Sequence, residues 1–355
     1  MPIDFVEVLK LAVSRKASDV HVVIGKPPMI RVRGEITPLE GFEPLTAAEA
    51  NRLVYAVLRD EQRKKFEESL ELDCSVSLPG VARFRVNVLA GHKGIEAVLR
   101  IINSTIPNPE DLGLTQTMID LAQLPRGLVL VTGPTGSGKS TTLASIIEII
   151  NRTRKDHILT IEDPIEFIYE PKQCIIRQRE VGATTKSFAN ALKSSLREDP
   201  DVILVGELRD LETISLAMTA SETGHLVFGT LHTTDAPQTV DRIIDVFPAH
   251  QQTQVRVQLA SSLKAVICQT LIPTADGAGR VAAREVMIVT SAISNLIREG
   301  KTHMIYGAVE TGFKFGMCTL DRALEELVKS GKIKLEDALA KARDPMKMKG
   351  QEKAA

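Results

Sequence analysis

The stretch that decides the fold is Gly-Leu-Val-Leu-Val-Thr at residues 127–132, followed by Gly-Pro-Thr-Gly-Ser-Gly-Lys-Ser at residues 133–140. An apolar, β-branched run leads into a glycine-rich loop, and a helical pattern follows over residues 141–150. Glycines allow consecutive backbone N–H groups to curl around an anion without Cβ clashes. The following helix directs the positive end of its dipole at that anion. Strand, loop and helix in this order are the context of the phosphate-binding P-loop.

A P-loop predicts that the chain binds a nucleoside triphosphate together with Mg²⁺. Lys139 would place a point charge at the β- and γ-phosphates, and the hydroxyl of Ser140 would be a ligand for Mg²⁺. The predicted nucleotide-binding residues are Gly133, Pro134, Thr135, Gly136, Ser137, Gly138, Lys139, Ser140 and Thr141.

Bulk composition indicates a soluble protein with two domains. The chain has 355 residues, of which 43% are hydrophobic and 25% charged, and its formal net charge is −1. This charge provides no general attraction to nucleic acid, and 4% aromatic residues without tryptophan supply few stacking surfaces. No apolar run is long enough to span a bilayer. Four scattered cysteines favour a reduced compartment, so we expect a cytoplasmic protein that reaches a membrane through a partner.

Residues 1–102 read as a small α+β domain. A helical pattern over residues 2–16 precedes two short strand patterns, and Thr46 with Glu49 forms a capping box for the next helix. Alternating apolar residues on either side of Pro79-Gly80 predict a hairpin, and a further strand follows at residues 95–102.

A proline-containing polar stretch at residues 103–112 predicts a linker, and the Lys-rich residues 346–355 predict a disordered tail. Between them, residues 113–345 alternate apolar runs with helical segments. This rhythm predicts an α/β domain with a mostly parallel sheet and helices on both faces. The predicted strands are residues 127–132, 157–161, 201–206, 225–231 and 281–289.

Two acidic segments follow predicted strands, where ligands bind in such sheets. Glu166 lies in Glu-Asp-Pro-Ile-Glu after the strand at 157–161, and we choose it to activate the attacking water. Glu207 follows an apolar run, as in a Walker-B motif, and is predicted to act in the metal–water shell. Asp163 shares the metal role in this prediction. The residue types alone do not determine which of these acidic residues takes which role.

Histidines and arginines complete the candidate set. His225 and His232 bracket one predicted strand, and His232 is at the end where a side chain can sense the γ-phosphate. Arginines stabilise the negative charge of phosphoryl transfer. The candidates are Arg83, Arg85 and Arg100 in the first domain, with Arg197, Arg209 and Arg242 in the second.

Several motifs together resemble the type II/IV secretion ATPase superfamily. They are Ala-Ser-Asp-Val-His at residues 17–21, the P-loop, Glu-Asp-Pro-Ile-Glu at 162–166, the run at 196–207 and Thr-Gly-His-Leu-Val-Phe-Gly-Thr-Leu-His-Thr at 223–233. The resemblance implies a PAS-like domain followed by a RecA-like ATPase core. It also implies a homohexameric ring, with ATP bound between the first domain of one subunit and the core of another.

The same resemblance implies a role for each candidate. Glu166 matches the catalytic glutamate and Glu207 the Walker-B glutamate, while His232 falls in the His box. Arg83, Arg85 and Arg100 lie in the region that supplies arginines to the nucleotide, and Arg242 is the further candidate on the core.

Residues 240–248 and 292–301 resemble the pilus-retraction branch of this superfamily. The implied function is pilus disassembly and twitching motility, and the implied partner is the inner-membrane platform protein of the pilus machine. The chain would then be cytoplasmic and peripheral at the inner membrane. Ser294 departs from the pattern, because the family usually has arginine there. That helix is tied to retraction rather than to hydrolysis.

Three alternatives have recognisable signatures. A pilus-extension or secretion ATPase usually carries a long N-terminal region and a tetracysteine motif, and this sequence has neither. A RecA-like nucleic-acid motor would have a basic stripe, which the charge balance disfavours. A non-catalytic scaffold would not need Lys139, Glu166 and Glu207 together.

Overall fold

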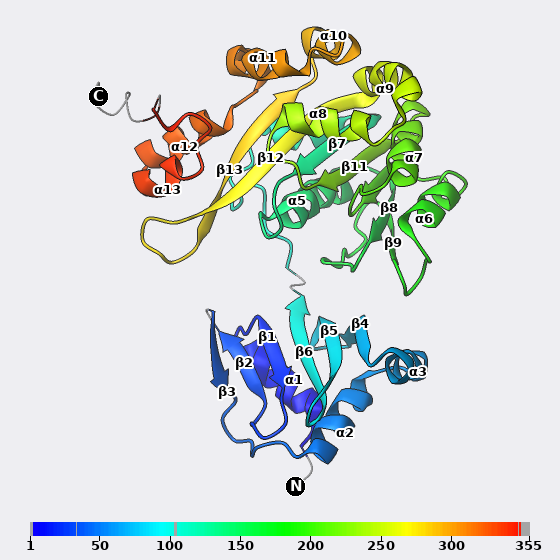
Figure 1. Cartoon of the computed structure of the whole chain (residues 1–355), viewed down its shortest axis with the longest axis vertical. Helices are drawn as coiled ribbons and strands as arrows, with labels where there is room; N and C mark the ends of the chain where they lie inside the picture. The colour runs from blue at the N-terminus through cyan, green and yellow to red at the C-terminus, as the bar shows by residue number, and fades with distance from the viewer. Residues whose placement is uncertain (1–2, 33, 103–104, 347, 349–355) are drawn as a thin grey trace. The chain divides into compact units, whose positions relative to one another are not determined.

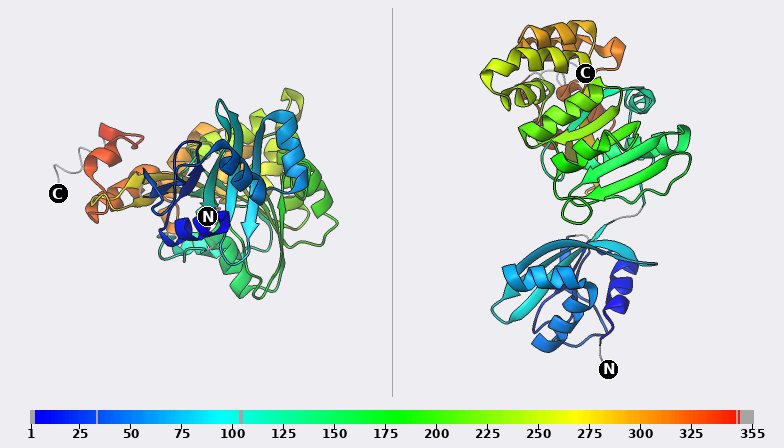
Figure 2. Two further views of the ribbon diagram at one scale, coloured as in Figure 1. Left: turned by 90° about the horizontal axis from the view of Figure 1, so that it is seen from below. Right: turned by 90° about the vertical axis from the view of Figure 1, so that its right-hand side faces the viewer.

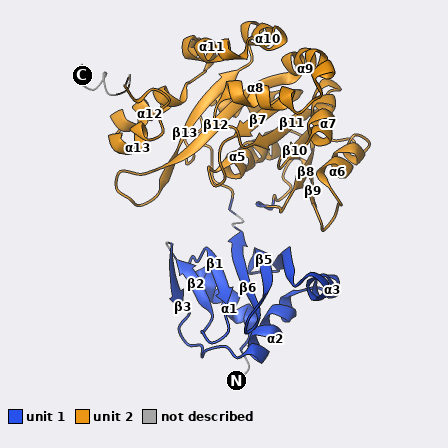
Figure 3. Cartoon of the chain, viewed as in Figure 1, with its two compact units in different colours: residues 1–105, 166–168 blue, residues 106–165, 169–355 orange. Residues whose placement is uncertain are grey.

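The computed structural model describes residues 3–32, 34–102, 105–346 and 348, and these residues form two compact units (Figure 3). Unit 1 comprises Met1–Thr105 with Glu166–Ile168, and unit 2 comprises Ile106–Ile165 with Tyr169–Ala355. Residues 103–104 of the expected linker lie outside the described residues, as does the expected tail apart from residues 346 and 348.

Unit 1 is a six-stranded antiparallel sheet with three helices, the α+β architecture expected for this region (Figure 1). The strand order is β3-β2-β1-β6-β5-β4. The elements are α1 (Phe5–Ser14), β1 (Asp19–Val22), β2 (Met29–Val32), β3 (Glu35–Pro38), α2 (Ala47–Val57), α3 (Asp60–Ser69), β4 (Glu71–Leu78), β5 (Ala82–Gly91) and β6 (Gly94–Ile102).

Short sequence motifs account for several elements of unit 1. The capping box that starts α2 is present, since Thr46 Oγ1 accepts from the Glu49 amide at 3.2 Å and Glu49 Oε2 accepts from the Thr46 amide at 2.9 Å. The predicted hairpin is β4–β5. Strand β3 was not predicted, because it is a short edge strand whose four residues are all exposed and carry no apolar alternation.

Unit 2 is built on a seven-stranded sheet with the order β13-β12-β7-β11-β10-β8-β9. Six strands run parallel, and β13 pairs antiparallel with β12, so the mostly parallel sheet is confirmed. The strands are β7 (Gly127–Thr132), β8 (His157–Glu162), β9 (Ile175–Glu180), β10 (Val202–Val205), β11 (Leu226–Leu231), β12 (Leu263–Pro273) and β13 (Arg280–Ile288).

Helices cover both faces of this sheet (Figures 1 and 2). The longer ones are α5 (Lys139–Thr153), α6 (Phe188–Ser195), α7 (Leu211–Glu222), α8 (Ala236–Asp245), α9 (Ala249–Ser262), α10 (Ser291–Arg298) and α12 (Leu320–Lys329). The shorter ones are α4 (Gln116–Asp120), η1 (Leu121–Gln123), η2 (Thr302–Met304), α11 (Ile305–Thr311), η3 (Phe313–Phe315) and α13 (Leu335–Leu339).

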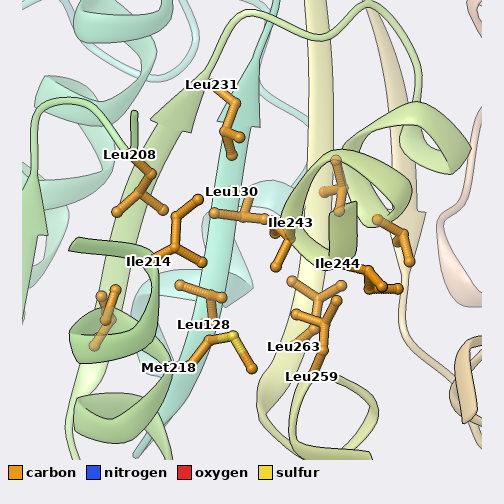
Figure 4. Close-up of a cluster of buried hydrophobic side chains, with 14 of the residues drawn as sticks. Leu128, Leu130, Leu208, Ile214, Met218, Leu231, Ile243, Ile244, Leu259 and Leu263 are labelled. Atoms are coloured by element: carbon orange, nitrogen blue, oxygen red, sulfur yellow. The ribbon is translucent and has the colours of Figure 1, made fainter. Parts of the chain in front are cut away.

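The main core of unit 2 lies between one face of the sheet and helices α6 to α11. Leu128 and Leu130 of β7 point into it and meet Ile214 and Met218 of α7 and Ile243 of α8 (Figure 4). Because side chains alternate along a strand, Val129 and Val131 face the opposite side. There the buried helix α5 packs on β7.

Strands β9 and β12 were not among the predicted strands. Strand β9 is a partly exposed edge strand with the polar sequence Ile-Ile-Arg-Gln-Arg-Glu. Strand β12 follows α9 without an intervening turn, so its apolar run reads as a continuation of the helix. Its parallel pairing with β7 decides its conformation. None of the helices in the described parts of the chain is long and apolar enough to cross a membrane.

A buried carboxyl group ties β13 to the start of α8. Glu285 is 2% exposed, and its Oε1 accepts a hydrogen bond from the Ala236 amide at 2.8 Å. Burial raises the pKa of Glu285 to about 7, and the nearby charge of Asp235 adds to this, while the Ala236 amide and Arg343 oppose it. The carboxyl group is therefore protonated more readily in the folded chain than in the unfolded chain.

We expect Glu285 to make folding stability depend on pH. Its folded pKa of about 7 exceeds the ordinary glutamate pKa of 4.5, so the unfolding free energy falls as pH rises through this interval, by about 3 kcal/mol. Glu285→Gln removes this slope, because the amide keeps the acceptor oxygen without titrating. Urea unfolding from pH 5 to 8 measures the difference, with the exposed Glu212→Gln as the control. Identical slopes in wild type and Glu285→Gln would contradict the assignment.

Candidate functional site

The candidate segments meet at one edge of the unit 2 sheet. Strands β7, β11, β10 and β8 are neighbours and run parallel, so their carboxyl ends lie together. The pairings Thr132 with Leu231 and Val205 with Ile161 show that these ends are nearly level. The P-loop follows β7, His232 follows β11, Glu207 lies two residues after β10, and the acidic segment with Asp163 follows β8.

The P-loop backbone depends on its glycines. Gly133, Gly136 and Gly138 have φ angles of 139°, 77° and 85°, which L-residues rarely adopt. At Gly133 space is also lacking, because a Cβ would overlap the backbone carbonyl oxygen of Gln269 on β12 and lie 2.8 Å from Ser137 Oγ. The loop is therefore packed directly against the neighbouring strand.

Lys139 and Ser137 show how the loop is prepared for an anion. Lys139 is buried as the first residue of α5, and its Nζ donates to the carbonyl oxygens of Gly133 at 2.7 Å and Pro134 at 3.2 Å. These bonds hold the ammonium group over the loop. The Ser137 hydroxyl is buried without a hydrogen-bond partner among the described residues, and a bound phosphate oxygen would provide one.

Close backbone packing positions the loop that carries Glu207. The Gly206 amide donates to the Ile161 carbonyl at 2.7 Å, and a Cβ on Gly206 would lie 3.2 Å from Glu162 Cα. The Leu208 amide donates to the Thr230 carbonyl at 3.0 Å, and Thr230 Oγ1 donates to the Gly206 carbonyl at 2.5 Å. Both neighbours of Glu207 are thus fixed between β8 and β11.

Glu207 binds two basic side chains. Its Oε1 lies 2.5 Å from Arg209 Nε and 3.0 Å from His232 Nε2. Burial raises the pKa of Glu207, but the hydrogen bond and charge of Arg209, with His232, outweigh it and hold the pKa below its usual value. Glu207 is therefore a carboxylate near neutral pH.

Arg242 shares this region. A hollow of about 570 Å³ is lined by Glu207, Arg209, His232 and Arg242, together with Gln238 and apolar neighbours. The structure therefore brings together three of the sequence-selected catalytic candidates, Glu207, His232 and Arg242. Arg209 was considered among the arginines but was not selected as a site residue. Its contact with Glu207 identifies it as part of the site, and the spacing of residues in the sequence did not predict that contact.

The segment after β8 contributes exposed carboxylates. Asp163 is exposed and interacts electrostatically with Arg209, so it lies in the same charged surroundings as Glu207. Glu166 is also exposed, in the three-residue segment grouped with unit 1. Its role as the water-activating base stays a prediction. His225, in contrast, lies at the opposite end of β11, where its Nδ1 is 2.9 Å from the Ala220 carbonyl oxygen.

The arginine candidates of unit 1 share one face of its sheet. Arg85 is exposed and pairs in register with Arg100 on the neighbouring strand. Arg100 Nε donates to the buried Asp19 at 2.9 Å. Arg83, two residues from Arg85 on the same strand, donates to Ser75 Oγ at 2.8 Å and Ser77 Oγ at 3.2 Å. Their contribution to a nucleotide site stays a prediction.

The donor atoms fit Mg²⁺ in the manner of other P-loop sites. Among the described residues no three His, Cys, Asp or Glu side chains are grouped as they would be for a metal held by protein alone. Mg²⁺ usually keeps several waters and binds through one or two protein oxygens and substrate phosphates. The Ser140 hydroxyl and the carboxylates of Glu207 and Asp163 are hard oxygen donors of this kind.

The comparison with protein families shows which family the chain belongs to. The model of the type II/IV secretion system protein family matches residues 3–339, which is nearly the whole chain. This chain belongs to that family. The fold, the P-loop and the family together make it a P-loop ATPase that binds nucleotide, with the α/β core and smaller α+β domain that the sequence predicted.

Similar proteins cover the same length. The type IV pilus retraction ATPase PilT of Pseudomonas aeruginosa is 54% identical over 96% of this chain and 99% of its own. A twitching motility protein of Neisseria gonorrhoeae is 53% identical over 90% of this chain and 86% of its own. A crystal structure of the pilus retraction motor PilT with bound ADP superposes with a TM-score of 0.92 at 46% identity, covering 98% and 99% of the two chains.

We expect two P-loop glycines to differ in their tolerance of alanine. Gly133→Ala combines an unfavourable φ with overlap on the Gln269 carbonyl, so it should lower the unfolding free energy by about 3 kcal/mol or more. Gly136→Ala has open space and carries only the backbone strain, about 1–2 kcal/mol. Urea unfolding without nucleotide measures both. Equal losses would show that the contact with β12 does not constrain the loop.

Proposed function

We propose that this chain is an ATP-hydrolysing motor that drives retraction of type IV pili and works as a homohexameric ring. The observation that carries the ATPase function is the P-loop on β7, level with the segments of Glu207, His232 and Asp163 on the next three parallel strands. The pilus function is supported by relatives with more than half of their residues identical over nearly the full chain.

The P-loop binds the phosphates. Backbone N–H groups of residues 135–141, at the loop and the start of α5, would surround the β- and γ-phosphates, and Lys139 would exchange its loop carbonyls for phosphate oxygens. Ser140 would hold Mg²⁺, with Glu207 in its metal–water shell and Asp163 sharing that role. The ion would supply neutralisation of the phosphate charge. Glu207 remains oriented by Arg209 and His232.

Hydrolysis needs a base and positive charge around the γ-phosphate. Glu166 accepts a proton from the attacking water in this proposal. His232 senses the γ-phosphate through its contact with Glu207, and Arg242 supplies positive charge from the same hollow. His232 directly follows β11 and Arg242 lies on α8, and rigid elements of this kind suit precise positioning.

Motion comes from the interface between subunits in the proposed ring. Arg83 and Arg85 of one subunit would complete the nucleotide site on the core of its neighbour, so ATP binding draws these parts together and product release frees them. Residues 103–110 act as the hinge. The moving ring acts on the inner-membrane platform protein of the pilus machine, which places the motor in the cytoplasm at the inner membrane.

Ser294 lies in the region proposed to serve retraction. Its hydroxyl donates to the Ala260 carbonyl on α9 at 2.8 Å and accepts from Arg298 Nη2 at 3.1 Å. These bonds join α10 to α9. The serine that departs from the family pattern therefore has a structural role within this helix pair, remote in sequence from the hydrolytic motifs.

We expect Glu166→Ala to lower kcat by about 10²-fold or more while ATP still binds, because the base is lost but the P-loop is intact. Lys139→Ala should instead lose most nucleotide binding, because the ammonium no longer neutralises the phosphates. Steady-state hydrolysis and calorimetric titration with a non-hydrolysable ATP analogue separate the two effects. The exposed neighbour Glu170→Ala is the matched control. If Glu166→Ala hydrolyses ATP at the wild-type rate, Glu166 is not the catalytic base.

Mixed rings test whether arginines act between subunits. Chains carrying Arg85→Ala or Lys139→Ala should each be nearly inactive in ATP hydrolysis. When the two are mixed and allowed to exchange, some sites combine an intact Arg85 with an intact Lys139 from different chains, so activity should recover. Mass measurement of the particles gives the subunit number. If activity does not recover although mixed particles form, Arg85 does not act across the interface.

A further inference from the structure

Gln269 on β12 contacts the P-loop with both its backbone and its side chain. Its carbonyl oxygen occupies the space where Gly133 would have a Cβ. Its side-chain Nε2 donates to the Ser137 carbonyl at 2.5 Å, and its Oε1 accepts from Thr142 Oγ1 at 2.8 Å. Gln269 is 4% exposed. A buried amide thus joins the loop to the first turn of α5.

Arg284 extends these contacts away from the nucleotide site. It lies on β13 opposite Gln269, and its Nε donates to Gln269 Oε1 at 2.8 Å. Its Nη1 donates to the carbonyl oxygens of Leu112 at 2.9 Å and Gly113 at 3.3 Å. Residues 112–113 belong to the segment through which the chain enters unit 2.

Burying the charged side chain of Arg284 costs more free energy than a purely structural role would require. The residue is 8% exposed, and in the described part of the chain its side-chain hydrogen bonds all go to neutral oxygens. Burial alone lowers its pKa to about 10, so it remains a cation. An apolar side chain would fill this space without the penalty of an uncompensated buried charge. The guanidinium is suited to another purpose, because its fork holds several carbonyl oxygens at once.

Peptide geometry connects these bonds to phosphate binding. The Ser137 carbonyl and the Gly138 N–H belong to one planar trans peptide, so they point in opposite directions. When Gln269 draws the Ser137 oxygen towards β12, it aims the Gly138 N–H away from β12. The N–H groups of a P-loop are its phosphate donors. The orientation of one of them therefore depends on Gln269 and, behind it, on Arg284.

We propose that Gln269 and Arg284 act as a positioning relay that couples phosphate occupancy of the P-loop to the entry segment at Leu112–Gly113. The inference rests on the proposed nucleotide site. Nucleotide that orders the Ser137–Gly138 peptide strengthens the bond to Gln269, fixes Arg284 and holds the two entry carbonyls. Coupling is reciprocal, so displacement of the entry segment weakens nucleotide binding. The relay links the site to the part of the chain nearest the proposed hinge.

Hydrogen exchange on the full chain tests the relay. The amides of residues 112–114 donate to carbonyls within the same segment, so their exchange reports its opening. In wild type, saturating ADP should slow their exchange by about fivefold. In Arg284→Lys, which keeps the charge but not the fork, the ADP effect at these amides should disappear. Arg280→Lys, on the exposed end of β13, should behave as wild type.

The kinetic readout distinguishes positioning from simple stability. Arg284→Lys should raise KM for ATP by about tenfold with kcat less affected, because phosphate binding is weakened in ground and transition states alike. Should Arg284→Lys fail to fold, Gln269→Glu takes its place, since it retains an acceptor for Thr142 and Arg284 but replaces the donor to Ser137 by a carboxylate oxygen. Calorimetry with ADP is run first. If ADP does not bind to the wild-type chain, the proposed function is wrong. If ADP binds but does not slow exchange at residues 112–114, the relay is wrong. The relay is also wrong if the slowing persists in Arg284→Lys.

Discussion

Parallel pairing of β7, β11, β10 and β8 is the constraint on which the site depends. Backbone hydrogen bonds set these strands in register, so segments up to 100 residues apart in sequence emerge at one edge of the sheet. Apolar burial on both faces makes the register rigid, because a slip would expose the side chains that α5 and α7 cover. The chemistry is then a matter of which residues follow each strand.

Charged groups at this edge are oriented by contacts within the chain. Loop carbonyls hold Lys139 over the phosphate position, and Arg209 and His232 hold Glu207 as a carboxylate. Pre-oriented charges need little reorganisation when substrate arrives, which favours catalysis. Arg85 and Glu166 are exposed side chains, and both are grouped with unit 1.

Strand β13 supports two functional segments with adjacent residues. Arg284 and Glu285 point to opposite faces of the sheet because side chains alternate along a strand. Arg284 reaches Gln269 behind the P-loop, and Glu285 binds the first amide of α8, the helix that follows His232 and carries Arg242. One antiparallel edge strand thus braces both sides of the site. Burying two ionisable groups there weakens stability. Arg284 lies behind the P-loop through Gln269, and Glu285 lies at the start of α8.

The P-loop, the acidic and histidine segments and the family could be recognised from the residues alone, because strand, glycine turn and helix are encoded locally. The sequence also identified Glu207, His232 and Arg242 as separate candidates, which the structure then placed around one hollow. The conformation of β12 and the contacts of Gln269 and Arg209 depend on the three-dimensional fold. Gln269 meets Ser137 across 132 residues of sequence, and β12 is a strand because it pairs with β7. Such long-range contacts leave no periodic signal in the chain, since they depend on how the sheet brings distant segments together.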